Sequence, residues 1–212
     1  MTKSIAGIAI PDSKLANEAA ELLHEYGDQL LWNHSHRVFL FGSLLGRQEN
    51  QKYDPELLYV SAVFHDLGLT KHYRSPDKRF EVDGANAARS LLEQHGLSKE
   101  STQLVWDAIA LHQTIGVAQY KGPVVALLYH GVGFDVMGDR FEELSEQTRT
   151  QVVSAFPRDS FKNKVLHAFL DGIRHKPETA FGNIDSDVCE RYLPSYTRPN
   201  FCDLVLQSPW NE

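Results

Sequence analysis

Cysteine is scarce in this chain, which has only Cys189 and Cys202 among its 212 residues. Both come late and lack zinc-finger spacing, so they predict neither a disulfide framework nor a zinc–thiolate site. We interpret both as reduced thiols and expect a cytoplasmic protein. The first ten residues carry one lysine and a short apolar run, without the pattern of a signal peptide. No window approaches about 18 consecutive apolar residues, so no membrane-spanning segment is expected.

An excess of positive charge is also missing, since the formal net charge is −7. Nucleic-acid binding needs a basic surface, which makes a nucleic acid an improbable partner. The glycine-containing segments 42–43 and 131–133 lack the rest of any phosphate-binding loop pattern, and no nucleophilic serine motif or redox-cofactor motif is visible. We expect a small molecule as the partner, with neither nucleic acid nor membrane, and self-association into a homo-oligomer stays open.

What the chain does contain is helical periodicity. Hydrophobic residues make up 42%, enough for a sizeable core, and they recur at helical spacing along most of the chain. Residues 124–129 have strand propensity, but they continue without a turn signal to position 135, which favours a helix. The expected helices cover residues 12–26, 29–45, 55–65, 81–95, 98–112, 124–135, 141–156 and 160–175, with one short helix near 185–192 in an irregular tail. We therefore expect one all-α domain over residues 1–212.

Four polar residues stand among apolar neighbours. The pair His65-Asp66 ends an apolar helix, His34 lies on the apolar face of the preceding helix, and Asp135 follows in another apolar segment. A buried carboxylate needs a cation or hydrogen-bond donors as partners. Two imidazoles and two carboxylates suit Zn²⁺, Fe²⁺ or Mn²⁺ and leave a position for water. The alternative is a set of unconnected core histidines and capping aspartates, and spacing alone favours neither interpretation.

Four short segments carry a family resemblance: NHSHR at 33–37, FHDLGLT at 64–70, RFEVDGA at 79–85 and ALH at 110–112. The order His, His-Asp, Asp resembles the HD-domain superfamily of metal-dependent hydrolases, and the segments resemble its cyanamide hydratase-like branch. The resemblance covers about residues 33–138. It implies a compact all-α HD-type domain, with its metal-site core at about 28–140 and helices in 141–212 completing it. It also implies one divalent ion, Zn²⁺ before Fe²⁺ or Mn²⁺, held by His34, His65, Asp66 and Asp135.

Further residues gain candidate roles from the same resemblance. The candidate catalytic residues are Asp66, His112, Lys71, Glu81 and Asp83, and the candidate substrate-binding residues are Asn33 and His112. Each has a plainer alternative. Glu81 and Asp83 open a helix, where the helix dipole alone favours carboxylates. Asn33 and Lys71 are equally compatible with the protein surface.

The implied reaction follows from the ion, which lowers the pKa of a bound water from about 15.7 to about 7. The branch resemblance implies that the resulting hydroxide adds to a nitrile-like carbon, as in the conversion of cyanamide to urea. One alternative is an HD phosphohydrolase acting on a nucleotide or phosphate ester, which needs cations near the ion; the candidates are Arg37, Lys71, Arg74, Lys78 and Arg79. Another is a non-catalytic, metal-containing ligand-binding module.

We expect one ion rather than two. Four histidines lie between the His-Asp pair and Asp135, namely His72, His95, His112 and His130. Only His112 and His130 stand near the ends of apolar helices, and no extra carboxylate accompanies them to offset a second ion's charge. We therefore assign His112 to the substrate pocket and give His130 a structural role.

Overall fold

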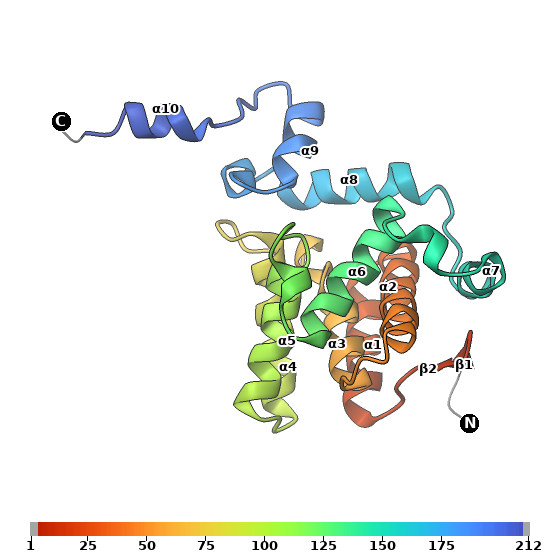
Figure 1. The fold of residues 1–212 in the computed structure, drawn as a ribbon. Helices are drawn as coiled ribbons and strands as arrows, with labels where there is room; N and C mark the ends of the chain where they lie inside the picture. The colour runs from red at the N-terminus through yellow and green to blue at the C-terminus, as the bar shows by residue number, and fades with distance from the viewer. Residues whose placement is uncertain (1–3, 210–212) are drawn as a thin grey trace.

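The computed structural model describes residues 4–209, and α-helices account for most of them (Figure 1). This confirms the all-α fold class. A short antiparallel hairpin of β1 (Ser4–Ile5) and β2 (Ile8–Ala9) precedes the helices and was not expected from the sequence. None of the helices within residues 4–209 has the length and apolar character needed to cross a membrane.

Four α-helices of the central bundle begin where the sequence places helix-capping residues. The side chains of Ser13, Asp28, Asp54 and Ser98 each accept a backbone N–H at a helix start. The apolar run at 124–129 is helical, as expected. The elements of the bundle are α1 (Lys14–Tyr26), α2 (Gln29–Gln48), α3 (Pro55–Phe64), η1 (Leu67–Leu69), α4 (Phe80–Gln94), α5 (Lys99–Leu111), η2 (Ala118–Tyr120) and α6 (Pro123–Met137).

The C-terminal part departs from the expected pattern at two places. The single helix expected over 141–156 is two elements, because Leu144 is extended and Ser145 caps a new helix. The tail holds a second helix beyond the expected one. The observed elements are η3 (Phe141–Glu143), α7 (Glu146–Ala155), α8 (Phe161–Ile173), η4 (Pro177–Ala180), α9 (Asp185–Tyr192) and α10 (Phe201–Leu206).

Helices α2 and α6 are in close contact, which brings His34 and Asp135 together. A Cβ atom on Gly131 would lie 2.4 Å from the carbonyl oxygen of Val38, so only glycine permits this approach. Gly84 has the same function where α4 meets the end of α3, since a Cβ there would lie 2.6 Å from the carbonyl oxygen of Phe64. These two contacts place α2, α3, α4 and α6 around one buried region.

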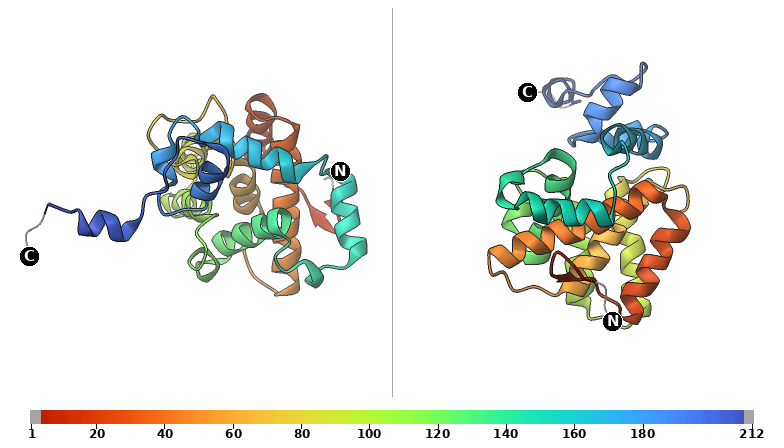
Figure 2. Two further views of the ribbon diagram at one scale, coloured as in Figure 1. Left: turned by 90° about the horizontal axis from the view of Figure 1, so that it is seen from above. Right: turned by 90° about the vertical axis from the view of Figure 1, so that its right-hand side faces the viewer.

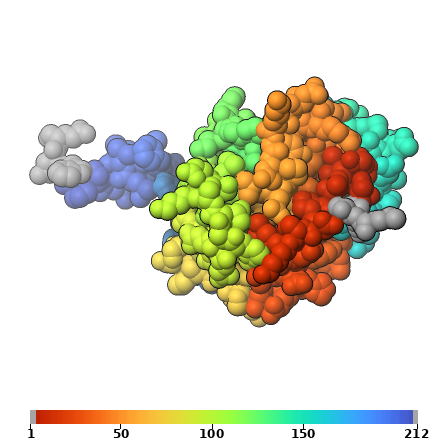
Figure 3. All heavy atoms as spheres, turned by 90° about the horizontal axis from the view of Figure 1, so that it is seen from below, coloured from red at the N-terminus to blue at the C-terminus, as the bar shows by residue number. Residues whose placement is uncertain are grey.

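A second layer lies across one end of the bundle. Figures 1 and 2 show α8 and α9 lying over the ends of the bundle helices, while α10 projects away from the body (Figure 3). A small hydrophobic core joins the layer to the bundle and includes Leu69, Phe80, Phe161, Phe169 and Ile173. The single-domain organisation stays a prediction, and this shared core is compatible with it.

Candidate metal centre

Three buried side chains converge where α2 meets the end of α3. His34 comes from α2, His65 follows α3, and Asp66 precedes η1. None of them is more than 2% exposed. One ligand atom from each lies within 4.8 Å of the others. The structure therefore brings together three of the four ligands expected from the sequence.

The hydrogen bonds of the two imidazoles determine which nitrogen faces the cluster. Nδ1 of His65 lies 2.7 Å from the carbonyl oxygen of Ala62, and Nδ1 of His34 lies 2.7 Å from Oδ2 of Asp135. A carbonyl and a carboxylate only accept, so both Nδ1 atoms carry the hydrogen. In the neutral rings, both Nε2 atoms then present lone pairs. These two atoms lie 3.1 Å apart.

The donor set fits a divalent cation. Oδ2 of Asp66 lies 3.3 Å from Nε2 of His65 and 3.5 Å from Nε2 of His34, and neither carboxylate oxygen of Asp66 has a hydrogen-bond partner among residues 4–209. Ligand atoms about 2.0–2.2 Å from a tetrahedral Zn²⁺ lie roughly 3.3–3.6 Å from one another, close to the observed spacings. Converging lone pairs repel one another unless a cation lies between them.

The electrostatics of the cluster also suit a cation. Burial opposes ionisation of Asp66, but the imidazoles of His65, His34 and His112 outweigh it and hold the pKa of this carboxyl well below its usual range. Burial lowers the pKa of His34, although Asp135 opposes that effect. Burial also opposes protonation of His65, but the Asp66 carboxylate outweighs it and raises the pKa of His65. A metal binds the ionised carboxylate and the neutral imidazoles, so a bound cation would take the place of the proton that Asp66 favours on His65.

Asp135 does not occupy the position expected of a fourth ligand. Its Oδ2 accepts the Nδ1 hydrogen of His34, on the side of the ring opposite the nitrogen that faces the cluster. Oδ1 accepts from Nε of Arg37 and Oδ2 from Nη2, both at 2.8 Å, and Oδ1 also accepts from Arg158. Both oxygens of Asp135 take part in these hydrogen bonds, which place it to orient His34, and its role as a fourth ligand stays a prediction.

Two arginines that were not expected as partners of Asp135 surround it. Arg37 lies one turn after His34 on α2, while Arg158 comes from the segment between α7 and α8. Burial opposes ionisation of Asp135, but its hydrogen bonds with His34 and Arg37 outweigh that effect and lower its pKa. The position of Arg37 on an otherwise apolar helix face was a usable signal, whereas Arg158 had none.

His112 lies beside the three converging residues. Nδ1 donates to the carbonyl oxygen of Ile109, so Nε2 carries the lone pair, as in His65. This Nε2 lies 3.8 Å from Oδ1 of Asp66 and has no hydrogen-bond partner among the described residues. Burial and the charge of His65 lower the pKa of His112 to about 3, which keeps it neutral. It lies beside the three converging residues with a free basic nitrogen, and its role in substrate binding or catalysis stays a prediction.

The two acidic residues at the start of α4 have different surroundings. Glu81 is fully buried; Oε1 accepts from the Arg79 guanidinium, and Oε2 has no partner within residues 4–209. Oδ2 of Asp83 accepts from the backbone N–H of Ser75 and from Nζ of Lys176, each at 2.8 Å. Glu81 therefore keeps a free oxygen for chemistry, whereas Asp83 holds the C-terminal segment against α4.

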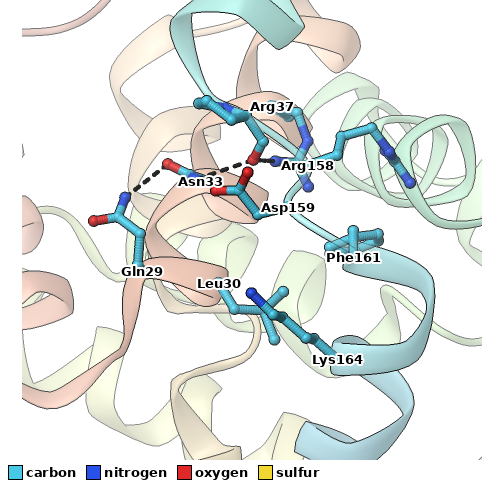
Figure 4. A pocket seen from close by; sticks show the side chains of 9 residues that line it. Gln29, Leu30, Asn33, Arg37, Arg158, Asp159, Phe161 and Lys164 are labelled. Atoms are coloured by element: carbon cyan, nitrogen blue, oxygen red, sulfur yellow. Dashed lines mark hydrogen bonds between the residues drawn. The ribbon is translucent and has the colours of Figure 1, made fainter.

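Two other candidates lie away from the cluster. Lys71 is exposed after η1, and no ion pair or hydrogen bond joins it to the described residues of the centre. Asn33 accepts from Gln29 and donates to the carbonyl oxygen of Pro157, in a small pocket of about 30 Å³ that includes Arg158 (Figure 4). These contacts give Asn33 a role in holding the segment before α8, and its role in substrate binding stays a prediction.

One family model matches part of the chain. Residues 31–123 match the family model of the HD domain, a segment that contains His34, His65, Asp66 and His112. The match supports the HD-domain superfamily, whose members are in general metal-dependent hydrolases. No curated protein matches the chain.

Proposed function

We propose that this HD-domain protein is a metal-dependent enzyme that adds water to a small nitrile-like substrate, as in the hydration of cyanamide to urea. The observation that carries the proposal is the convergence of Nε2 of His34, Nε2 of His65 and the Asp66 carboxylate at 3.1–3.5 Å from one another. Buried lone pairs so arranged form a cation site, and a cation held by three side chains retains room for water and substrate.

The residues that would hold the ion are His34, His65 and Asp66. When bound, a divalent ion polarises the substrate and makes a water molecule acidic near neutral pH. The chain supplies the proton acceptors around it. Oε2 of Glu81 and Nε2 of His112 both lack partners within the described residues, and both are buried. Each of these atoms has a lone pair that no other described group occupies, so each is available to accept a proton during the reaction.

The charges around the centre favour an uncharged substrate over a phosphate ester. Of the cations considered from the sequence, Arg37 is paired with Asp135, Arg79 with Glu81 and Lys78 with Asp77. Arg74 donates to a backbone carbonyl, and Lys71 is exposed. A phosphate ester carries charge that needs unpaired cations or backbone donors close to the ion.

The nitrile substrate rests on the resemblance of residues 33–37, 64–70, 79–85 and 110–112 to the cyanamide hydratase-like branch. The burial of the centre supports a small substrate, because each ligand residue is at least 98% buried. We propose Zn²⁺ as the ion, since two imidazoles and a carboxylate are typical of catalytic zinc. We also propose a single ion per chain and a cytoplasmic location.

Two measurements test this function together. Elemental analysis of protein purified without chelator should find about one transition-metal ion per chain, and Asp66→Ala should lose it, whereas the exposed Asp171→Ala should keep it. The metal-loaded protein should then release urea from cyanamide faster than it releases phosphate from nucleotides. Phosphate release without turnover of any nitrile would replace the hydratase by the phosphohydrolase. A protein that binds none of Zn²⁺, Fe²⁺ and Mn²⁺ would exclude both the hydratase and the phosphohydrolase.

A further inference from the structure

Helix α9 brings a buried carboxyl group to the region of the centre from the part of the chain that no motif covered. Asp185 is 1% exposed, and its Oδ1 has no hydrogen-bond partner among residues 4–209. Its backbone N–H donates to Oδ1 of Asn183 at 2.8 Å, and Oγ of Ser186 donates to the carbonyl oxygen of Asn183. The turn that starts α9 therefore fixes the position of Asp185.

The charged groups that face Asp185 come from three other parts of the fold. Glu81 at the start of α4 and Asp66 at the metal centre act on it as negative charges, and Arg79 and Lys176 act as positive ones. Oε2 of Glu81 is unpartnered as well. Burial first, and then the charges of Glu81 and Asp66, raise the pKa of Asp185 to about 8 in spite of the two cations. Neighbouring buried carboxyl groups do not readily ionise together.

A pocket lies directly outside these residues. It has a volume of about 410 Å³, and its lining includes Arg79, Gln113, Asn183 and Ile184. Each of these four residues is one or two positions along the chain from Glu81, His112 or Asp185. This volume suits a small organic molecule, and it lies against the three elements that carry the unpartnered atoms.

We propose that Asp185 is a catalytic residue of the reaction proposed above, with its carboxyl group donating a proton to the substrate nitrogen. The inference rests on the proposed function for the identity of the reaction. It assigns a chemical role to the C-terminal segment, because only when α9 lies over the bundle does it carry Asp185 to the pocket that Arg79 and Gln113 also line.

The proton transfers balance without another reactant. The water oxygen forms a bond to the nitrile carbon, one carbon–nitrogen π bond breaks, and the nitrogen takes the proton of Asp185. The proton lost by the water goes to Oε2 of Glu81. A shift of the remaining hydroxyl proton to nitrogen gives the amide, and proton transfer from Glu81 to Asp185 restores both groups. One water is consumed, and nothing is oxidised or reduced.

Asp185→Asn tests the role directly, because it keeps the shape of the side chain and removes the acidic proton. Turnover of cyanamide (kcat) should fall by about 100-fold or more, the scale of general acid catalysis, with KM changed severalfold at most and metal content unchanged. The matched control is Asp171→Asn, an exposed aspartate of α8. A loss of kcat limited to threefold in Asp185→Asn would overturn the proposal.

A second readout does not depend on the substrate. Carboxyl ¹³C NMR of aspartate-labelled protein, metal-free and Zn²⁺-loaded, should show one signal that is absent from Asp185→Asn and titrates well above the ordinary aspartate range. Titration of that signal in the ordinary range in both samples would overturn the proton-donor role. A raised titration in a protein that turns over no nitrile supports the donor and overturns only the proposed substrate.

Discussion

The Asp135 carboxylate lies 2.7 Å from Nδ1 of His34 and fixes the ring so that Nε2 faces the other converging side chains. An asparagine at this position retains one acceptor oxygen, but its NH₂ group must then face a donor of Arg37 or His34. We expect Asp135→Asn to lower metal affinity by roughly 10- to 100-fold, because the substitution weakens the hydrogen bond that orients the ligand His34. Competition with a chelator measures the affinity.

The exposed Asp139→Asn, just beyond α6, is the control and should bind metal as the parent protein does. The same variants loaded with Co²⁺ report on the ligands through their visible absorption spectra. We expect similar spectra for the parent and Asp135→Asn. A changed spectrum that shows the loss of an oxygen ligand would identify Asp135 as a ligand and contradict the geometry described above.

Replacement of His112 separates chemistry from metal binding. Its free Nε2 lies 3.8 Å from Asp66, so we expect His112→Ala to lower turnover by roughly 10²- to 10⁴-fold while about one ion per chain is retained. Parallel metal analysis and cyanamide assays check this. Loss of the single ion would make His112 a ligand, and a fall from two ions to one would contradict the mononuclear centre.

The buried ion pair of Lys176 and Asp83 should contribute strongly to the attachment of the C-terminal segment. Both residues are buried, and Nζ lies 2.8 Å from Oδ2. Removal of one partner from a buried pair costs about 3–5 kcal/mol, because it leaves the other charge without compensation. We expect Lys176→Met and Asp83→Asn each to lower the free energy of unfolding by about this amount in urea denaturation, whereas the exposed Lys162→Met should have little effect.

The double variant distinguishes a pair from two independent residues. If the two side chains act as a pair, the free energy lost by Lys176→Met with Asp83→Asn is well below the sum of the single losses. Additive losses would contradict the coupling. Turnover of the single variants then shows whether Asp83 has any role beyond this attachment.

The stability of the protein should depend on pH through Asp185. Its pKa is raised to about 8 in the folded protein from the ordinary value of 3.8, so the folded state holds a proton that the unfolded state releases between these values. The resulting contribution is complete below pH 4 and is lost as pH rises towards 8. We therefore expect the gain in Tm from Asp185→Asn, measured by calorimetry on metal-free protein, to increase from pH 4 to pH 8. A constant difference would contradict the raised pKa.

The sequence by itself determined the helical class and most helix starts, because caps and periodic apolar residues act over one or two turns. Ser13, Asp28 and Asp54 are examples. It also determined that His65 and Asp66 lie together in the interior, since they are adjacent at the end of an apolar helix. The break between η3 and α7 was missed because the extended conformation of Leu144 has no strong local signature.

Only the tertiary structure decided which atoms face one another. The sequence identified Asp135 as a buried carboxylate, but the side of the His34 ring that it contacts depends on the close approach of α2 and α6 at Gly131. Arg158, Lys176 and Asp185 meet residues more than twenty positions away in the chain, with no motif to connect them. Their roles follow from the layer of α8 and α9 over the bundle, because the stability of a buried charge depends on the partners that the whole fold brings to it.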